Sequence, residues 1–416
     1  METVKAFYSR QVGDHGKPPN GNMGNYFHRL LGDCVGVQNG RKWKSIRRVF
    51  EPHFSHQRAV GAMSGFEVEI TKWRKDLTKD SNDESGFTVD AVTACRIMPF
   101  KLIAISLFGA EVMNADRFRQ LLDLNIVHER IMLNTFFGRK ETSRMYNALW
   151  TASKKDMDFF LAGWKTYVLD SIEDAERNLY SSPIKEIYSS VAEGSMTERE
   201  FLQTVDEILF ANLDVMSSIM AFLLINLSKR QEAQDELRNE VLDQASKGPD
   251  EPESMKAYAQ RTDTLLEYTC MESIRLCPAA WFTLPEHATA DTEIGGYRIK
   301  AGTACIIDWV RLNTESPIWT FVSKESRQEI TGKSFYPRRF EGLSPARYRW
   351  SFLRFGLGGR QCLGKNFGTI MMKQFLIEVL SHYKLHLDGQ ASKESIELRE
   401  DRFTVTPTQD VRFVKI

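Results

Sequence analysis

One cysteine near the C-terminal end of the chain has neighbours that suit a metal ligand. Cys362 follows a glycine-rich loop and Arg360, and it precedes an apolar helix predicted over 370–380. A thiolate there would face backbone N–H groups and the positive end of that helix, which both lower the pKa of a cysteine. No CxxC or HxxxH pattern beside it completes a tetrahedral site. An isolated cysteine is more often a buried free thiol, but this arrangement favours a metal held by a macrocycle, which indicates haem.

The residues around Cys362 resemble the haem-binding signature of the cytochrome P450 monooxygenases. All five fixed positions of the pattern Phe-x-x-Gly-x-Arg-x-Cys-x-Gly are present in 355–364. The resemblance implies that Cys362 is the axial thiolate ligand of haem b, iron protoporphyrin IX, and that Arg360 pairs with a haem propionate. The other three positions would shield the sulfur, permit the tight turn and let the next helix approach the porphyrin: Phe355, Gly358 and Gly364.

Composition is typical of a globular enzyme. The chain has 416 residues, of which 42% are hydrophobic, so it can bury a large core. Its formal net charge is zero, so no overall field favours nucleic acid. Six scattered cysteines without disulfide-framework spacing indicate a reduced, intracellular protein.

Helical periodicity dominates the sequence. It predicts helices over 43–54, 91–108, 156–178, 197–227, 232–245 and 265–276, and the fourth begins with a capping box from Thr197 to Glu200. Strand patterns cluster between Phe282 and Trp309. The expected fold class is mainly α with a small β-sheet region. By the resemblance, this is the cytochrome P450 fold.

The resemblance runs from about residue 5 to the end of the chain. Family members generally begin with a membrane anchor, a proline-rich hinge and the first strands, whereas this sequence starts close to the second helix of the family. We therefore expect residues 1–416 to form a single cytochrome P450 catalytic domain that is N-terminally incomplete.

A second pair of motifs supports the haem interpretation. Glu272 and Arg275 lie three apart on one predicted helix face and can pair. Such pairs alone are usually solvated contacts of little value. Here a Phe-x-Pro-x-Arg-Phe sequence follows and resembles the second arginine motif of the family. The resemblance implies that its Arg339 joins Glu272 and Arg275 in a buried structural triad that locks the cysteine loop.

A third motif lies near the N-terminus. Trp43 and Arg47 share a helix face and resemble the Trp-x-x-x-Arg that holds a haem propionate in the family. In isolation, a basic amphipathic helix for nucleic acid or a solvated face would be the commoner interpretation. The remaining cations would form a basic rim on the thiolate side, where NADPH-cytochrome P450 reductase could dock through charge complementarity: Arg41, Lys42, Lys44 and Arg48.

The stretch 210–218 resembles the oxygen-activation motif of the family, with departures. Asp214 matches the acidic position, Asn212 replaces a glycine, and Val215 stands where a proton-relaying threonine is usual. Valine has no hydroxyl to relay a proton. The Ser218 hydroxyl or a water could substitute, because Ser218 shares a helix face with Asp214. Alternatively, the substrate supplies the hydroxyl, or the enzyme uses a different route. We therefore expect Asp214, Ser218 and Asn212 to act in proton delivery.

One strand residue also departs from the family pattern. Glu286 occupies a position where the family often has an Arg or His for a propionate. A carboxylate would repel that group, so either His287 or a water compensates, or the site is rearranged.

The resemblance implies a haem-thiolate monooxygenase that inserts one oxygen atom from O2 into a small, largely apolar organic substrate. Electrons would come from NADPH through the reductase. The amino-acid sequence at 210–215 and 307–309 resembles that of fungal family members that make secondary metabolites. The family implies the cytosolic face of the endoplasmic reticulum membrane, although association would require an anchor outside this sequence. Two alternatives stay open: coupling, dehydrogenation or rearrangement on the same haem, or a haem-binding but catalytically degenerate protein.

Overall fold

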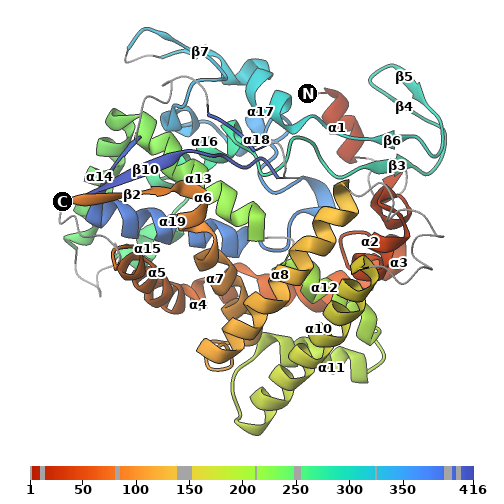
Figure 1. The fold of residues 1–416 in the computed structure, drawn as a ribbon. Coiled ribbons are helices and arrows are strands. Elements are labelled where there is room, and N and C mark those ends of the chain that lie inside the picture. The colour runs from red at the N-terminus through yellow and green to blue at the C-terminus, as the bar shows by residue number, and fades with distance from the viewer. Residues whose placement is uncertain are drawn as a thin grey trace.

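A computed structural model describes residues 2–9, 15–79, 85–137, 152–210, 213–247, 254–323, 326–387, 396–399 and 404–416. The protein is mainly helical with small antiparallel sheets, as the sequence predicts (Figure 1). The longer helices are α1 (Glu2–Ser9), α2 (Gly24–Leu31), α3 (Gly40–Phe50), α5 (Met63–Leu77), α7 (Ile97–Phe108), α8 (Ala115–Phe137), α10 (Ala152–Arg177), α11 (Pro183–Ala192), α12 (Glu198–Leu209), α13 (Leu213–Lys229), α14 (Gln231–Ala245), α16 (Leu265–Leu276) and α19 (Lys365–His382).

The core is built around α13. Leu223, Leu224 and Ile225 are fully buried, and nearly every residue from Met216 to Ser228 is inaccessible to solvent. Figure 1 shows α13 passing through the middle of the molecule with α19 beside it, and α6 (Ala91–Cys95), α7 and α16 also pack on it. A helix that is apolar on all sides requires cover on all sides, and these neighbours provide it.

Two predicted helices differ from the structure in their continuity. The predicted helix over 91–108 is divided into α6 and α7 at Arg96. Pro99 explains the break, because it lacks the N–H that would bond back to Cys95 across the junction. The predicted helix over 197–227 is described as α12 and α13, which flank residues 211 and 212. The capping box between Thr197 and Glu200 is confirmed at the start of α12.

Small sheets flank the helical body. Strands β1 (His15–Gly16), β3 (Glu286–Ala288) and β6 (Ala304–Cys305) form one sheet in the order β1-β3-β6. The antiparallel register pairs His15 with Ala288 and Gly16 with His287. A second sheet joins β2 (Gly86–Asp90), β10 (Asp410–Lys415) and β9 (Tyr383–Leu387). Two hairpins complete the set: β4 (Thr292–Ile294) with β5 (Tyr297–Ile299), and β7 (Phe321–Val322) with β8 (Glu329–Ile330).

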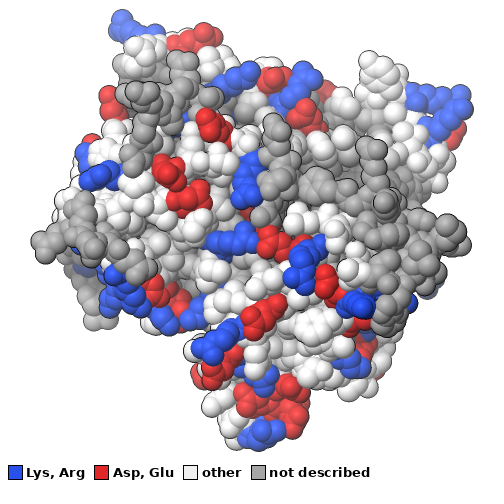
Figure 2. All heavy atoms as spheres, viewed as in Figure 1, with Lys and Arg blue, Asp and Glu red and all other residues white. Residues whose placement is uncertain are grey.

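Charge is mixed over the surface. Figure 2 shows Lys and Arg interspersed with Asp and Glu over the face in view, in keeping with the zero net charge. Two helical stretches within the described residues are long and apolar enough to cross a membrane, Ala91–Phe108 and Glu198–Lys229. Their most apolar windows are 61% and 88% buried within the protein, which is typical of core helices.

Two adjacent phenylalanines of α10 provide a matched test of the packing. Phe160 is fully buried against Trp164, Phe210 and His128, whereas Phe159 is 64% exposed. We expect Phe160→Ala to lower the free energy of unfolding by about 3–5 kcal/mol. Phe159→Ala should change it by less than about 0.5 kcal/mol. Urea unfolding followed by far-UV circular dichroism measures both, and equal losses would contradict the packing described.

Candidate haem-thiolate site

The cysteine loop has a defined shape within the protein alone. Gly356 and Gly358 adopt φ values of +78° and +72°, which L side chains rarely reach, so the tight turn requires glycine at both positions. The backbone N–H of Cys362 donates to the carbonyl of Phe355 at 2.9 Å and closes the loop. The thiol is thereby held at the start of α19.

The helix after the cysteine comes close to both the sulfur and the central helix. Gly364 is the N-cap of α19, and a Cβ there would lie 3.8 Å from Cys362 Sγ. One turn further, a Cβ on Gly368 would lie 3.7 Å from both Met216 Sδ of α13 and a ring carbon of Phe355. The cysteine loop and α13 therefore both lie against the first turns of α19, at Gly364 and Gly368.

The electrostatic surroundings of Cys362 differ from the sequence-based expectation. The Cys362 side chain is exposed in the protein by itself, yet the atoms packed around its sulfur raise the pKa of the thiol through desolvation, although the Gly364 N–H and the Arg47 guanidinium act to lower it. The expected lowering of the pKa is wrong for the protein by itself, because desolvation outweighs the N–H groups. A bound metal would supply the missing positive charge, since a coordinating thiol is deprotonated.

Three side chains predicted to hold haem lie around the same loop. Trp43 and Arg47 come from α3, and Arg47 Nη1 donates to the Gln361 carbonyl at 2.7 Å. The Arg360 guanidinium lies over the Trp43 indole, 4.7 Å from its centroid. A cavity of about 620 Å³ is lined by Trp43, Arg47 and Cys362 together.

These residues fit a thiolate-bound haem. The buried Nε of Arg47 has no hydrogen-bond partner among the described residues, so it can donate to a carboxylate. Across the described ranges, no three His, Cys, Asp or Glu side chains gather where they could hold a metal ion. A single thiolate with cations beside it suits a macrocycle that carries its own nitrogen ligands and carboxylates.

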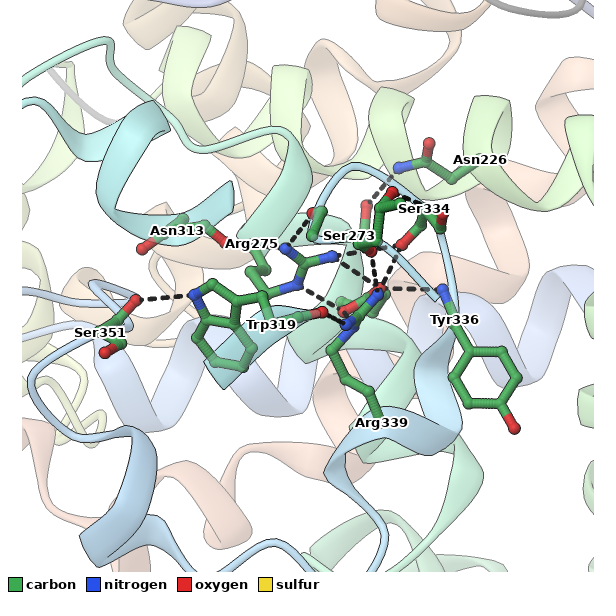
Figure 3. A network of polar contacts seen from close by, with 12 residues as sticks. Asn226, Ser273, Arg275, Asn313, Trp319, Ser334, Tyr336, Arg339 and Ser351 are labelled. Carbon is green, nitrogen blue, oxygen red and sulfur yellow. Dashed lines mark hydrogen bonds and ion pairs between the residues drawn. The ribbon is translucent and has the colours of Figure 1, made fainter. Parts of the chain in front are cut away.

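The structure brings Glu272, Arg275 and Arg339 into one fully buried cluster (Figure 3). Arg275 contacts both oxygens of Glu272 at 2.7 and 2.9 Å, and Arg339 Nε contacts them at 2.9 and 3.1 Å. The Tyr336 N–H donates to Glu272 as well, at 2.8 Å. The remaining guanidinium N–H groups donate to backbone carbonyls, so the buried charges are hydrogen-bonded as such a cluster requires: those of Asn313, Trp319, Thr331, Gly332 and Ser334.

One residue links this triad to the cysteine loop. Arg275 donates to the carbonyl of Asn313 at 2.7 Å. The fully buried Asn313 side chain in turn bonds both the N–H and the carbonyl of Leu353, at 2.9 and 3.2 Å. Leu353 lies two residues before Phe355. Sequence reasoning missed Asn313, since no motif singles it out.

A second buried ion cluster was also missed. Glu267 of α16 pairs with Arg354 at 2.5 Å and with Lys373 of α19 at 2.7 Å. Burial opposes ionisation, but the two cations hold the pKa of Glu267 below its usual range. Arg354 immediately precedes Phe355, so this cluster fixes the loop from the other side. The sequence feature that could have indicated this cluster is Lys373, a lysine inside the apolar helix that follows Cys362.

The residues expected to deliver protons lie in separate networks. Asp214 pairs with Arg96 at 3.2 Å, and Arg96 also pairs with Glu129 of α8 at 2.8 Å. The Ser218 hydroxyl instead bonds the Thr406 hydroxyl at 3.1 Å in a buried position. The side-chain contacts described for Asp214 and Ser218 thus lead to different residues, Arg96 and Thr406. Asn212 lies outside the described residues.

Helix α8 is bonded to α12 directly and to α13 through Arg96. His128 contacts Asp206 of α12 at 2.9 Å and stacks on Phe210. The next residue, Glu129, reaches α13 through Arg96. These ties lie on either side of residues 211 and 212. The sequence analysis assigned no role to His128, Asp206 or Arg96.

The loop before α3 is held between helix α12 and the cysteine loop. Backbone N–H groups of 33–36 donate, at 2.6 to 3.2 Å, to three side chains of α12: Gln203, Thr204 and Glu207. At its other end, the Gln38 carbonyl accepts from Arg360 at 2.9 Å. One loop thus connects α12 to the cysteine loop.

The basic rim is smaller than expected. Lys44 and Arg48 are exposed and line the cavity with Lys365. Lys42 instead pairs with Asp33 and Glu200, at 3.0 and 2.9 Å. Its charge is therefore partly offset within the protein.

Comparison with known proteins is consistent across the whole chain. Residues 3–412 match the family model described as Cytochrome P450. Cytochrome P450 monooxygenase lepD of Aspergillus flavus is 36% identical over 99% of this chain and 79% of that relative. Cytochrome P450 monooxygenase PUL2 of Kluyveromyces lactis is 31% identical over 99% of this chain and 79% of its own length. Cytochrome P450 monooxygenase apdB of Emericella nidulans is 34% identical over 89% of this chain and 76% of that protein.

The Glu267 cluster makes stability depend on pH. A carboxylate whose folded pKa is depressed stabilises the fold fully above its ordinary pKa of 4.5, and this contribution is lost as pH falls through the folded pKa. Glu267→Gln should therefore destabilise the protein most near neutral pH, with a deficit that shrinks toward about pH 4. Urea midpoints at each pH measure the difference. The exposed Glu232→Gln is the control, and a Glu267→Gln deficit independent of pH would contradict the cluster.

Proposed function

The chain belongs to the cytochrome P450 family, and from this membership we propose that Cys362 is the thiolate ligand of its haem. The observation that carries the proposal is the convergence of Cys362, Trp43 and Arg47 on one cavity, with Arg360 stacked on the Trp43 indole. These residues come from segments more than 300 positions apart in the sequence.

The protein is a haem-thiolate monooxygenase. The haem with its cysteine ligand supplies the activation of O2, because thiolate ligation favours O–O cleavage. In our proposal Arg47, Arg360 and the Trp43 indole donate to the haem carboxylates. Phe355 covers the sulfur, and the Gly364 N–H partly offsets its negative charge. Glu272, Arg275 and Arg339 hold the loop without touching the reacting atoms.

For proton delivery, we propose that Asp214 acts together with Arg96. The pair is partly exposed, with 33% and 27% of the two side chains accessible, so its carboxylate can exchange protons with solvent. Val215 cannot relay a proton, and Ser218 is oriented by Thr406. Ser218 can still relay a proton if its hydroxyl accepts from Thr406 and donates to a water or to the substrate. Asn212 stays a prediction from the sequence.

The proposed substrate is a small, largely apolar organic molecule. Met216 beside the cysteine loop, and Trp281 and Phe282 after α16, provide apolar surface, and the latter two are 42% and 48% exposed. The similarity to monooxygenases of Aspergillus flavus and Emericella nidulans supports a place in fungal secondary metabolism.

We further propose that electrons come from NADPH-cytochrome P450 reductase, at the cytosolic face of the endoplasmic reticulum. The docking surface would include Arg41, Lys44, Arg48 and Lys365, all of which are exposed. An acidic partner would be attracted there by charge complementarity.

The ligand assignment is tested by replacing one cysteine at a time. The wild type should give a thiolate-type Soret band in its reduced, CO-bound spectrum, and Cys362→Ala should lose that band because no other thiolate lies beside the cavity. Cys305→Ala, at a half-buried thiol on β6, should keep it. Survival of the band in Cys362→Ala would overturn the assignment. A normal band without turnover would favour the degenerate alternative.

The proton route is tested with Asp214→Asn. Loss of a positioned proton donor should lower product formation by about 100-fold, while the CO spectrum stays unchanged. The substrate would be the compound that accumulates in a host deleted for this gene, assayed with NADPH and the reductase. Asp116→Asn, at an 84% exposed side chain, is the control. Unchanged turnover in Asp214→Asn would show that the route is wrong.

A further inference from the structure

An ion pair across two strands lies next to the residues assigned to the haem carboxylates. The register of β1 and β3 pairs Gly16 with His287, so Lys17 follows directly opposite Glu286. Lys17 Nζ contacts Glu286 Oε1 at 3.0 Å. Only 13% and 8% of the two side chains are exposed. The carboxylate that was expected to repel a haem propionate thus faces a lysine that directly follows the neighbouring strand.

The backbone of Lys17 is fixed relative to Arg360. The Lys17 N–H donates to Asn39 Oδ1, and Asn39 Nδ2 donates back to the Lys17 carbonyl, both at 2.8 Å. The same Asn39 Oδ1 accepts from Arg360 Nη2 at 2.9 Å. One amide oxygen therefore contacts the backbone of Lys17 and the guanidinium of Arg360.

The charges of this group act on one another. Burial lowers the pKa of Arg360, while the nearby carboxylate of Glu286 raises it and Arg47 lowers it further. Glu286 therefore acts on two cations, Lys17, which it contacts, and Arg360. Arg47 has a carboxylate of its own, since it pairs with Glu51 at 3.2 Å. Two cations that share one carboxylate repel each other, and a further anion between them would relieve that repulsion.

We propose that Lys17 is a further cofactor-holding residue, which donates to a haem carboxylate while Glu286 orients its ammonium group. This inference rests on the proposed function, since it requires haem at the Cys362 loop. A short side chain at position 17, directly after β1, could not reach both partners, whereas the four-carbon stem of lysine allows its three N–H donors to contact Glu286 and a second carboxylate.

The test measures how fast the holoenzyme loses haem to excess apomyoglobin. Four variants are compared with wild type: Lys17→Met, Glu286→Gln, the double variant Lys17→Met/Glu286→Gln, and Lys300→Met. The last removes an exposed lysine at the end of β5 and is the matched control. The double variant also removes the carboxylate charge that Lys17→Met alone would leave without its lysine, so it separates haem binding from simple loss of the ion pair.

We expect Lys17→Met to release haem about tenfold faster, the equivalent of one lost charge-assisted hydrogen bond. The double variant should release haem as fast as Lys17→Met does. Glu286→Gln should stay within about twofold of the wild-type rate, because Lys17 still donates to the haem carboxylate. Lys300→Met should match wild type.

Three outcomes would overturn the inference. Lys17→Met could release haem at the wild-type rate, or the double variant could recover that rate, which would mean that the pair only stabilises the strands. Equal acceleration in Lys300→Met would mean that the effect is not specific to this site. The proposed function fails separately, if the wild-type holoenzyme lacks the thiolate-type spectrum.

Discussion

The buried carboxylate of Glu272 is the constraint on which the haem side of the protein depends. A charge that is fully removed from water is stable only when it is completely hydrogen-bonded, and Glu272 meets this condition with two guanidiniums and the Tyr336 N–H. The guanidiniums in turn need carbonyl partners, which fixes the backbone of segments from residues 313 to 334. Through Asn313, that requirement extends to the residues just before the cysteine loop.

The loop before α3 is also fixed by polar contacts. It buries Cys34 and Val35 in the core, and in addition its N–H groups are bonded to side chains of α12 and its last carbonyl to Arg360. On the core side, Asn226 of α13 donates to Ser273, the neighbour of Glu272, at 3.0 Å. The central helix, the ion triad and the cysteine loop are thus connected by short polar contacts rather than by packing alone, which sets their mutual distances closely.

Much of this arrangement could be predicted from local sequence. The bounds of α16 match the predicted 265–276, and the capping box of α12 is where the pattern indicates. Long-range pairings could not be predicted. Glu267 finds Arg354 and Lys373 only after two helices and a loop have packed, and Lys17 meets Glu286 only because of a strand register. Helix α8 was missed for another physical reason: its buried face carries Asn125, His128 and Thr135, which interrupt the apolar stripe that periodicity detects.

The closed shape of the cysteine loop has a consequence for how the enzyme is assembled. Its hydrogen bond from Cys362 to Phe355, its two left-handed glycines and its anchor at Leu353 are all made by the polypeptide itself. Each of these contacts restricts the loop without any contribution from the cofactor, so each reduces the conformational entropy that cofactor binding would have to remove. A binding loop that its own chain holds in place gains affinity in this way, because little remains to be ordered on binding.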